Sequence, residues 1–97
     1  MPAYLILFRL TQKGIENVRE VPARVTRAKQ LFEDAGARVE RFYALLGQYD
    51  TVFIAEAPDD ETVARAALSV ASLGNVRTEV MRAFTEEEFG RVVAGLP

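Results

Sequence analysis

The sequence predicts an α+β protein in which four strands form one sheet and two helices cover a single face of it. Four apolar segments have the length of strands, and two longer segments repeat their apolar residues at helical spacing. These segments follow one another in the order βαββαβ, and one more short helix is expected at the C-terminus. The 97 residues, 49% of them hydrophobic, fit one folded domain, which we expect to span residues 1–97.

The chain begins with a strand and a long helix. Ala3 to Leu10 is an apolar run of strand length, and Thr11 is expected to cap a brief turn after it. The long helix is expected to begin at Pro22, since proline suits a first helical position, and to end before Gly36 as a left-handed cap. Its apolar stripe consists of Val21, Val25, Ala28, Phe32 and Ala35. Glu20 and Arg24 form an i,i+4 pair that is expected on the opposite side.

Two strands joined by a turn follow. The predicted strands are Ala37 to Leu46 and Thr51 to Ala57, and the turn between them is Gly47-Gln48-Tyr49-Asp50. Alternation predicts that Val39 and Tyr43 share one face of the first of these strands.

The second half repeats the pattern of helix and strand. Acidic residues 59–61 are typical of a helix start, and the helix that they open ends at Gly74. Its apolar positions are Val63, Ala66, Ala67 and Val70. A strand is expected from Val76 to Phe84, and Thr85 with Glu88 forms a capping box for the last helix. The apolar side of that helix consists of Phe89, Val92, Val93 and Leu96.

The element order predicts a ferredoxin-like sandwich, because two split βαβ units with right-handed crossovers produce that arrangement. The first strand is apolar on both faces, with Ile6 and Phe8 on one and Leu5 and Leu7 on the other. Two helices cover only one face, so something else must cover the other. A second copy of the same sheet is the simplest cover, which predicts a homodimer, or a higher multiple, of the dimeric α/β barrel type.

Four short motifs resemble those of a known family. They are Gly47-Gln48-Tyr49-Asp50 followed by Glu56-Ala57-Pro58-Asp59-Asp60, then Leu73-Gly74-Asn75-Val76-Arg77-Thr78, then Ala83-Phe84-Thr85. In combination they resemble the GYD domain family, over nearly the whole chain. The resemblance implies a ferredoxin-like, dimeric α/β barrel of unassigned activity.

The composition excludes several kinds of chemistry. The chain has no histidine and no cysteine, so it cannot form a Ser-His-Asp or Cys-His nucleophile or a usual zinc site, and we expect no cofactor. Glu56 and acidic residues 59–61 are better explained by helix capping than by a metal site, so none is expected. The net charge of -2 argues against a nucleic-acid partner. With no signal peptide and no apolar stretch of membrane-spanning length, we expect a soluble, cytoplasmic protein without a membrane partner.

The candidate ligand-binding residues are Tyr49, Asp50, Arg9 and Arg82. Gly47 and Gly74 are expected to be structural, because each lies where the chain turns abruptly. For the Gly-x-Tyr-Asp turn, ordinary hairpin chemistry competes with a polar anchor at the mouth of a pocket. For the two arginines, cross-strand ion pairs compete with an anion-binding patch.

Two functions are open from sequence. The first is a homo-oligomeric module that binds a small ligand or another protein. The second is a cofactorless enzyme of the monooxygenase or isomerase type that such barrels host, so whether the chain is an enzyme is undecided. A titratable group with a shifted pKa facing a closed pocket would favour the enzyme, whereas a filled interior would favour the module.

Overall fold

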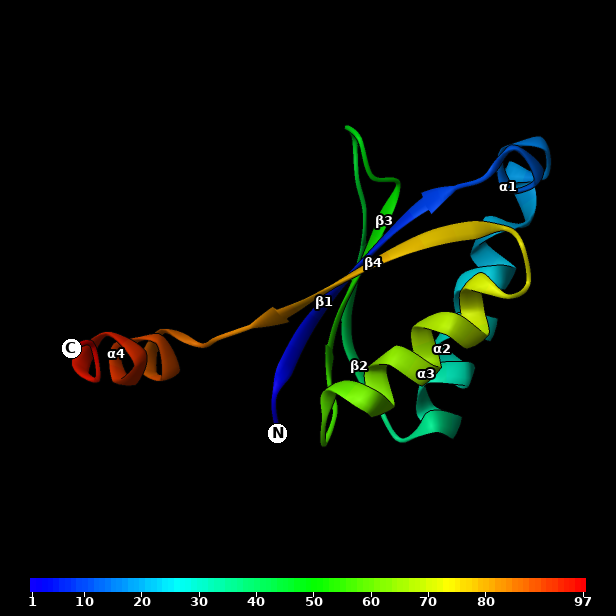
Figure 1. Ribbon diagram of the computed structural model, residues 1–97. Coiled ribbons are helices and arrows are strands. Elements are labelled where there is room, and N and C mark those ends of the chain that lie inside the picture. Colours follow the sequence, from blue (N-terminus) through cyan, green and yellow to red (C-terminus); the bar gives the residue numbers. More distant parts are fainter.

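The computed structural model describes all 97 residues and contains one four-stranded antiparallel sheet (Figure 1). The strands are β1 (Ala3–Leu10), β2 (Arg38–Ala44), β3 (Thr51–Glu56) and β4 (Val76–Ala83). Their order in the sheet is β2-β3-β1-β4. The helices are α1 (Gln12–Glu16), a 3₁₀ turn (Val18–Glu20), α2 (Val21–Ala35), α3 (Asp60–Ala71) and α4 (Glu86–Ala94). This confirms the ferredoxin-like α+β prediction and the C-terminal helix.

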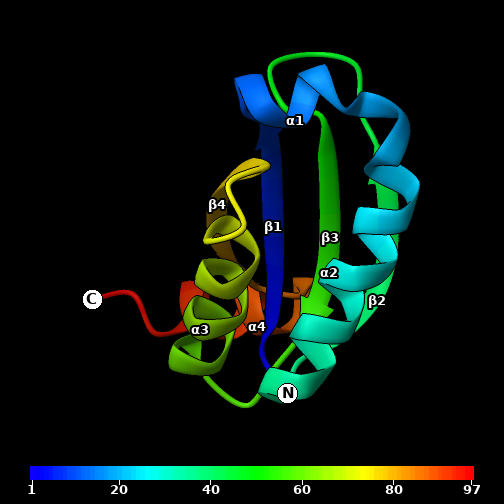
Figure 2. The ribbon, with the colours of Figure 1, turned by 90° about the vertical axis from the view of Figure 1, so that its right-hand side faces the viewer.

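Helices α2 and α3 lie side by side over one face of the sheet (Figure 2). The core between the two layers is built from alternate residues of the central strands and from the apolar stripes of both helices. Phe53 of β3 lies at its centre, with its ring edge-on to the rings of Phe8, Phe32 and Phe42 at centroid distances of 4.9, 5.3 and 6.2 Å. All four predicted apolar positions of α3 are buried, as are Ala28 and Phe32 of α2. The helical spacing therefore identified the buried faces correctly.

The other face of the sheet has no covering layer within the chain. Strand register places six apolar side chains on it, namely Leu5, Leu7, Tyr43, Val52, Ile54 and Met81. Tyr43 is 48% exposed and Met81 is 42% exposed. Apolar residues thus lie on both faces of the sheet, as the sequence predicts. We call this uncovered side the open face.

One strand departs from the predicted alternation. The β2–β3 register shifts between Val39 and Arg41, so one extra residue interrupts the ladder. Val39 and Phe42 both pack against the core, whereas Tyr43 lies on the open face. The prediction that Val39 and Tyr43 share a face is therefore wrong, because a bulge reverses the direction of every later side chain.

Helix α4 extends away from the rest of the molecule as an arm (Figure 1). The Cα radius of gyration is 14.5 Å, whereas a compact chain of this length has about 12.5 Å. The predicted capping box of Thr85 and Glu88 is present at its start. None of its residues is buried, and Phe89, Val92 and Val93 are 48–57% exposed. Leu96, which was expected on the same helix, lies beyond its end at Ala94 and is 67% exposed.

Candidate functional site

The Gly47–Asp50 segment lies in the loop between β2 and β3, and its aspartate fastens that loop to β1. Gly47 has a φ of 142°, which an L side chain rarely adopts, so the predicted unusual backbone is present. The backbone N–H of Leu10 donates a 2.7 Å hydrogen bond to Oδ2 of Asp50. The backbone N–H of Asp50 in turn donates to the carbonyl of Phe8 at 2.8 Å. Asp50 therefore prolongs the β1–β3 pairing by one residue.

Tyr49, the neighbour of Asp50, joins a charged cluster at one end of the sheet. Its hydroxyl donates a hydrogen bond to the carboxylate of Glu79, and this bond raises the pKa of Tyr49 above its usual value. The guanidinium of Arg9 lies 5.0 Å from the Tyr49 ring centroid, while its Nε donates to the Gln48 carbonyl at 2.8 Å. Arg77 is the direct cross-strand partner of Arg9. These side chains line a shallow, open hollow with two cations and one carboxylate.

Arg82 lies at the other end of β1, because it is the register partner of Tyr4. Its guanidinium donates to the carbonyls of Ala3 and Ala83, and it lies 4.7 Å from the ring centroid of Phe84. It also reaches Glu88 of α4 at 3.6 Å. These contacts attach the base of the α4 arm to the sheet.

The four predicted ligand-binding residues thus do not converge on one site. The structure brings Arg9 and Tyr49 together, while Asp50 borders a different pocket and Arg82 lies at the opposite end of the sheet. Gly74, predicted as structural, has a φ of 85° in the loop before β4.

The acidic residues near α3 have structural partners. Asp59 caps α3 by accepting hydrogen bonds from the backbone and hydroxyl of Thr62, and these bonds lower its pKa. Asp60 accepts a 2.5 Å hydrogen bond from the hydroxyl of buried Tyr4. Burial, followed by this bond to Asp60, raises the pKa of Tyr4 to about 12. Nowhere in the molecule do three acidic side chains converge closely enough to hold a metal ion.

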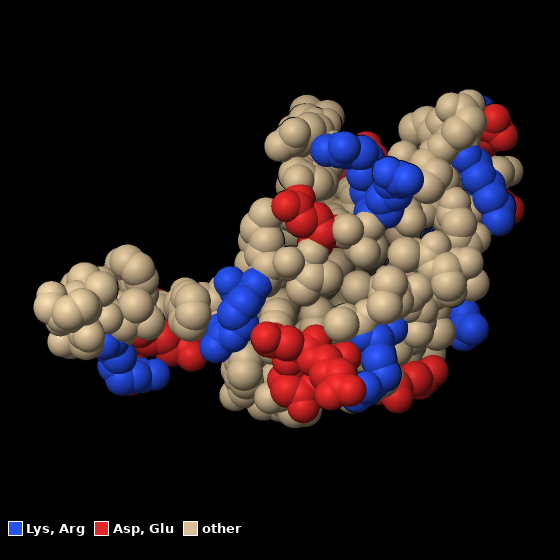
Figure 3. Space-filling model, in the orientation of Figure 1, with Lys and Arg blue, Asp and Glu red and all other residues tan.

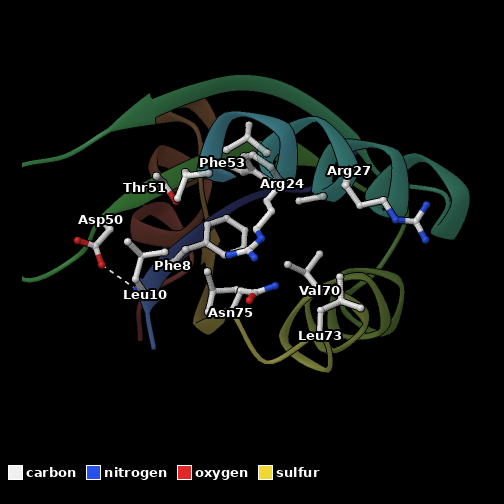
Figure 4. Close-up of a pocket in the computed structure, with 14 residues that line it drawn as sticks. Phe8, Leu10, Arg24, Arg27, Asp50, Thr51, Phe53, Val70, Leu73 and Asn75 are labelled. Carbon is white, nitrogen blue, oxygen red and sulfur yellow. Dashed lines mark hydrogen bonds between the residues drawn. The ribbon is translucent and has the colours of Figure 1, made fainter. Parts of the chain in front are cut away.

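A second pocket, which the sequence did not predict, lies between α2, the end of α3 and the sheet (Figure 4). We call it the α2–α3 pocket. Fourteen residues line it, nine of them hydrophobic, and its polar lining includes Arg24, Asp50 and Asn75. The predicted ion pair of Arg24 with Glu20 is present at 3.0 Å. However, Arg24 borders the pocket instead of lying wholly on the outer side of α2, which corrects that expectation.

The two pockets bear on the question of catalysis. The interior is not completely filled, since the α2–α3 pocket remains. Neither of the tyrosines with a raised pKa, Tyr4 and Tyr49, lines that pocket.

No helix is both long enough and apolar enough to cross a membrane.

Comparison with known proteins gives a family and a fold. The family model described as GYD domain matches residues 4–93. A Thermus thermophilus protein named "Glutamine synthetase and cystathionine beta-lyase binding protein" is 44% identical over 84 residues, which cover 86% of this chain and 88% of that protein.

Solved structures share the fold at low sequence identity. A crystal structure of a protein from Thermus thermophilus has a TM-score of 0.58 at 24% identity, covering 88% of this chain and 95% of that one. The Mycobacterium tuberculosis feast or famine regulatory protein, complexed with L-methionine, has a TM-score of 0.66 at 14% identity. That match covers 88% of this chain but 51% of the regulator. At these identities the likeness concerns the fold alone.

Proposed function

Since the chain belongs to the GYD domain family, we propose that it is a protein-binding module that works as a homodimer and binds metabolic enzymes. Its partners would be glutamine synthetase, cystathionine beta-lyase or both, the enzymes in the name of its 44% identical relative. The observation that carries this proposal is that identity, which extends over 86% of the chain. The absence of histidine and cysteine agrees with a function that needs no nucleophile.

The open face supports the dimer. Its centre is apolar, and its rim carries both signs of charge, with Arg9 and Arg77 near Glu79. A monomer rarely leaves a contiguous apolar sheet surface in water. A second copy facing the first would bury the apolar centre, and a rim of mixed charge avoids repulsion between two fields of one sign. In this arrangement the two sheets form the α/β barrel that the sequence predicts.

The α4 arm is also expected to belong to the dimer contact. Four strands of about seven residues cover roughly 450 Å² in projection, from the ordinary spacing and rise of strands. The nine residues of α4 extend the surface available to a second copy by roughly 140 Å² in projection, from helix length and width. An arm that lies against the second copy therefore enlarges the contact beyond the sheet alone.

The surface of the arm fits this role. Its charges gather along one side, while the opposite side is uncharged (Figure 3). Phe89, Val92 and Val93 fall on one stripe of the helix, Leu96 follows its last residue by two positions, and all four side chains are about half exposed or more. A second copy would cover this stripe permanently, whereas an enzyme partner would leave it exposed in the free protein.

Enzyme binding is tested with purified components. The full-length protein is titrated by calorimetry into glutamine synthetase and, separately, into cystathionine beta-lyase from its own source organism. We expect saturable binding to at least one enzyme, and no binding to an unrelated enzyme of similar size and charge. If neither enzyme binds at protein concentrations on the order of 0.1 mM, where even weak specific complexes form, the proposed partners are wrong.

The arm is tested by two substitutions that introduce the same residue. Val93→Glu places a charge on the apolar stripe, whereas Arg91→Glu changes the charged side next to it. We expect Val93→Glu to weaken dimerisation and Arg91→Glu to leave it close to wild type. Equal effects of the two variants would show that the apolar stripe makes no contact in the dimer.

A further inference from the structure

The loop between β2 and β3 is fastened at its base but leaves one leucine free at its tip. The backbone N–H of Leu45 donates to the carbonyl of Asp50 at 2.9 Å, and Asp50 is itself attached to β1 by two hydrogen bonds. Nε of Arg9 donates to the Gln48 carbonyl at 2.8 Å. By contrast, the side chain of Leu46 is fully exposed. The loop therefore presents Leu46 from a backbone that is already held in place.

The tip of this loop projects from the molecule. In Figure 1 the loop stands out from the sheet, well apart from the α4 arm, and Figure 3 shows the same region as an uncharged projection with basic side chains beside it. A leucine on a fastened loop costs little conformational entropy when a partner covers it, because the backbone is ordered beforehand. Such a loop suits insertion into an apolar depression of another molecule.

Two arginines lie beside the loop and directly opposite each other. Arg9 of β1 and Arg77 of β4 are register partners, and alternation places Arg9 on the open face with Leu7. Like charges directly opposite each other on two strands destabilise a sheet. The five ion pairs within the chain involve other arginines, and Glu79, the carboxylate of the same hollow, accepts a hydrogen bond from Tyr49. An acidic group placed between the two guanidiniums would offset their repulsion and accept hydrogen bonds from both.

The shape of this region favours a protein over a small molecule. The hollow that Arg9, Arg77 and Tyr49 line is shallow and open, whereas small-molecule sites bury most of the surface of their ligand. A small molecule in the hollow would also leave Leu46 uncovered. Arginine and tyrosine are among the residue types that most often dominate binding between proteins.

An enzyme fits this surface better than a second copy does. In the proposed dimer the two sheets face each other at their apolar centres, whereas residues 45–50 lie outside all four strands. A twofold contact of this region with itself would place the arginines of both copies together, since such a contact uses the same patch on each copy. An acidic surface on a different protein has no such cost.

We propose that the loop end, defined by Leu46, Arg9, Tyr49 and Arg77, is the surface that docks the enzyme partner. Leu46 enters an apolar depression of the enzyme, and an acidic side chain of the enzyme lies between Arg9 and Arg77. This inference rests on the proposed enzyme binding and adds to it the surface used and the chemistry of the partner's surface.

Charge reversal with a matched control tests the cationic half of the loop end. Arg77→Glu is compared with Arg27→Glu, which changes an exposed arginine of α2 that is also outside every ion pair. Each full-length variant is titrated by calorimetry into the enzyme that binds the wild type. We expect Arg77→Glu to weaken binding about tenfold or more, because it sets like charges against each other, and Arg27→Glu to change it less than about twofold. Added salt should weaken the binding of the wild type more steeply than that of Arg77→Glu.

The apolar half is tested in the same way on two exposed leucines. Leu46→Asp places a charge on the loop tip, whereas Leu68→Asp places the same charge on α3, where the leucine is 67% exposed. We expect Leu46→Asp to weaken enzyme binding about tenfold or more and Leu68→Asp to leave it within about twofold of wild type. Circular dichroism verifies the fold of each variant, and sedimentation equilibrium should show that all of them assemble as the wild type does.

Three outcomes overturn the proposal, and they differ in what else they remove. A wild-type protein that binds neither enzyme removes the enzyme partners and the loop end together. If the wild type binds but either Arg77→Glu or Leu46→Asp binds equally well, the loop end alone is wrong and enzyme binding stands. Dissociation of the dimer by either variant would show that the loop end contacts a second copy instead.

Discussion

Asp50→Ala is expected to destabilise the fold, because Asp50 serves β1 as a hydrogen-bond acceptor. Its Oδ2 accepts a 2.7 Å hydrogen bond from the backbone N–H of Leu10, and the substitution leaves that N–H without this partner. A hydrogen bond to a charged group contributes about 1.5–3 kcal/mol, so we expect a loss in this range from the free energy of unfolding. Asp50→Asn retains an acceptor oxygen but not the charge, so its loss should be about 1 kcal/mol.

Thermal melts at one fixed protein concentration measure this effect, since the stability of a dimer depends on concentration. For a chain of this length, 1 kcal/mol corresponds to about 4–8 °C, so Asp50→Ala should lower the midpoint by roughly 6 °C or more. Tyr49→Phe is the control in the same loop, because it removes only an exposed hydroxyl that bonds Glu79, and its midpoint should match wild type. If Asp50→Ala melts like wild type, the Asp50 carboxylate does not stabilise β1 and is free for another role.

Three further predictions concern backbone and pH. Gly47→Val should cost more than about 1 kcal/mol, because φ is 142° there although the surrounding space is open; an unchanged urea midpoint would show that the turn tolerates a side chain. Gly14→Ala should cost about 1–3 kcal/mol, since the added Cβ would collide with the carbonyl oxygen of Asn75, and a stable variant would mean that this approach is not tight. Finally, the folded-state pKa of Tyr4 is about 12, above its ordinary 10, so its neutral form stabilises the fold below pH 10 and this stabilisation disappears between pH 10 and 12. Urea melts across that range should lose stability more steeply for wild type than for Tyr4→Phe, and parallel curves would contradict the assignment.

The helices and the core were predictable because burial follows a simple period. Val63, Ala66, Ala67 and Val70 recur at helical spacing, and all are buried. Gly36 ends α2 in the left-handed region, with a φ of 103°, as its position after the last apolar residue predicts. Such local signals depend only on residues within a few positions of one another.

Features that depend on register or on tertiary packing were not predictable. The bulge after Val39 adds one residue to β2, and nothing local in the sequence marks it. The proximity of Arg9 to Arg77 follows from the register of β1 with β4, which periodicity does not specify.

The α2–α3 pocket was missed for the same reason. The Glu20–Arg24 pair is a local signal and was predicted correctly, but that pairing alone suggests a solvent-exposed arginine. Arg24 borders a cavity only because α3 and the loop containing Asn75 pack against α2 in the folded chain. Arg24 follows Val21 by three residues and precedes Ala28 by four, so helical spacing places it at the edge of the apolar stripe, and this is the one signal that pointed to the pocket.

Sedimentation equilibrium at micromolar concentration measures whether the chain dimerises through the open face. The wild-type chain of 10.8 kDa should sediment at twice that mass or a multiple of it. Leu7→Arg, on the open face, should shift the mass to 10.8 kDa, whereas Leu68→Arg, which replaces a 67% exposed leucine of α3, should leave the assembly intact. Circular dichroism verifies that both variants fold. A wild-type protein that sediments as a clean monomer, or a folded Leu7→Arg that assembles as wild type does, would show that the open face is not a dimer interface.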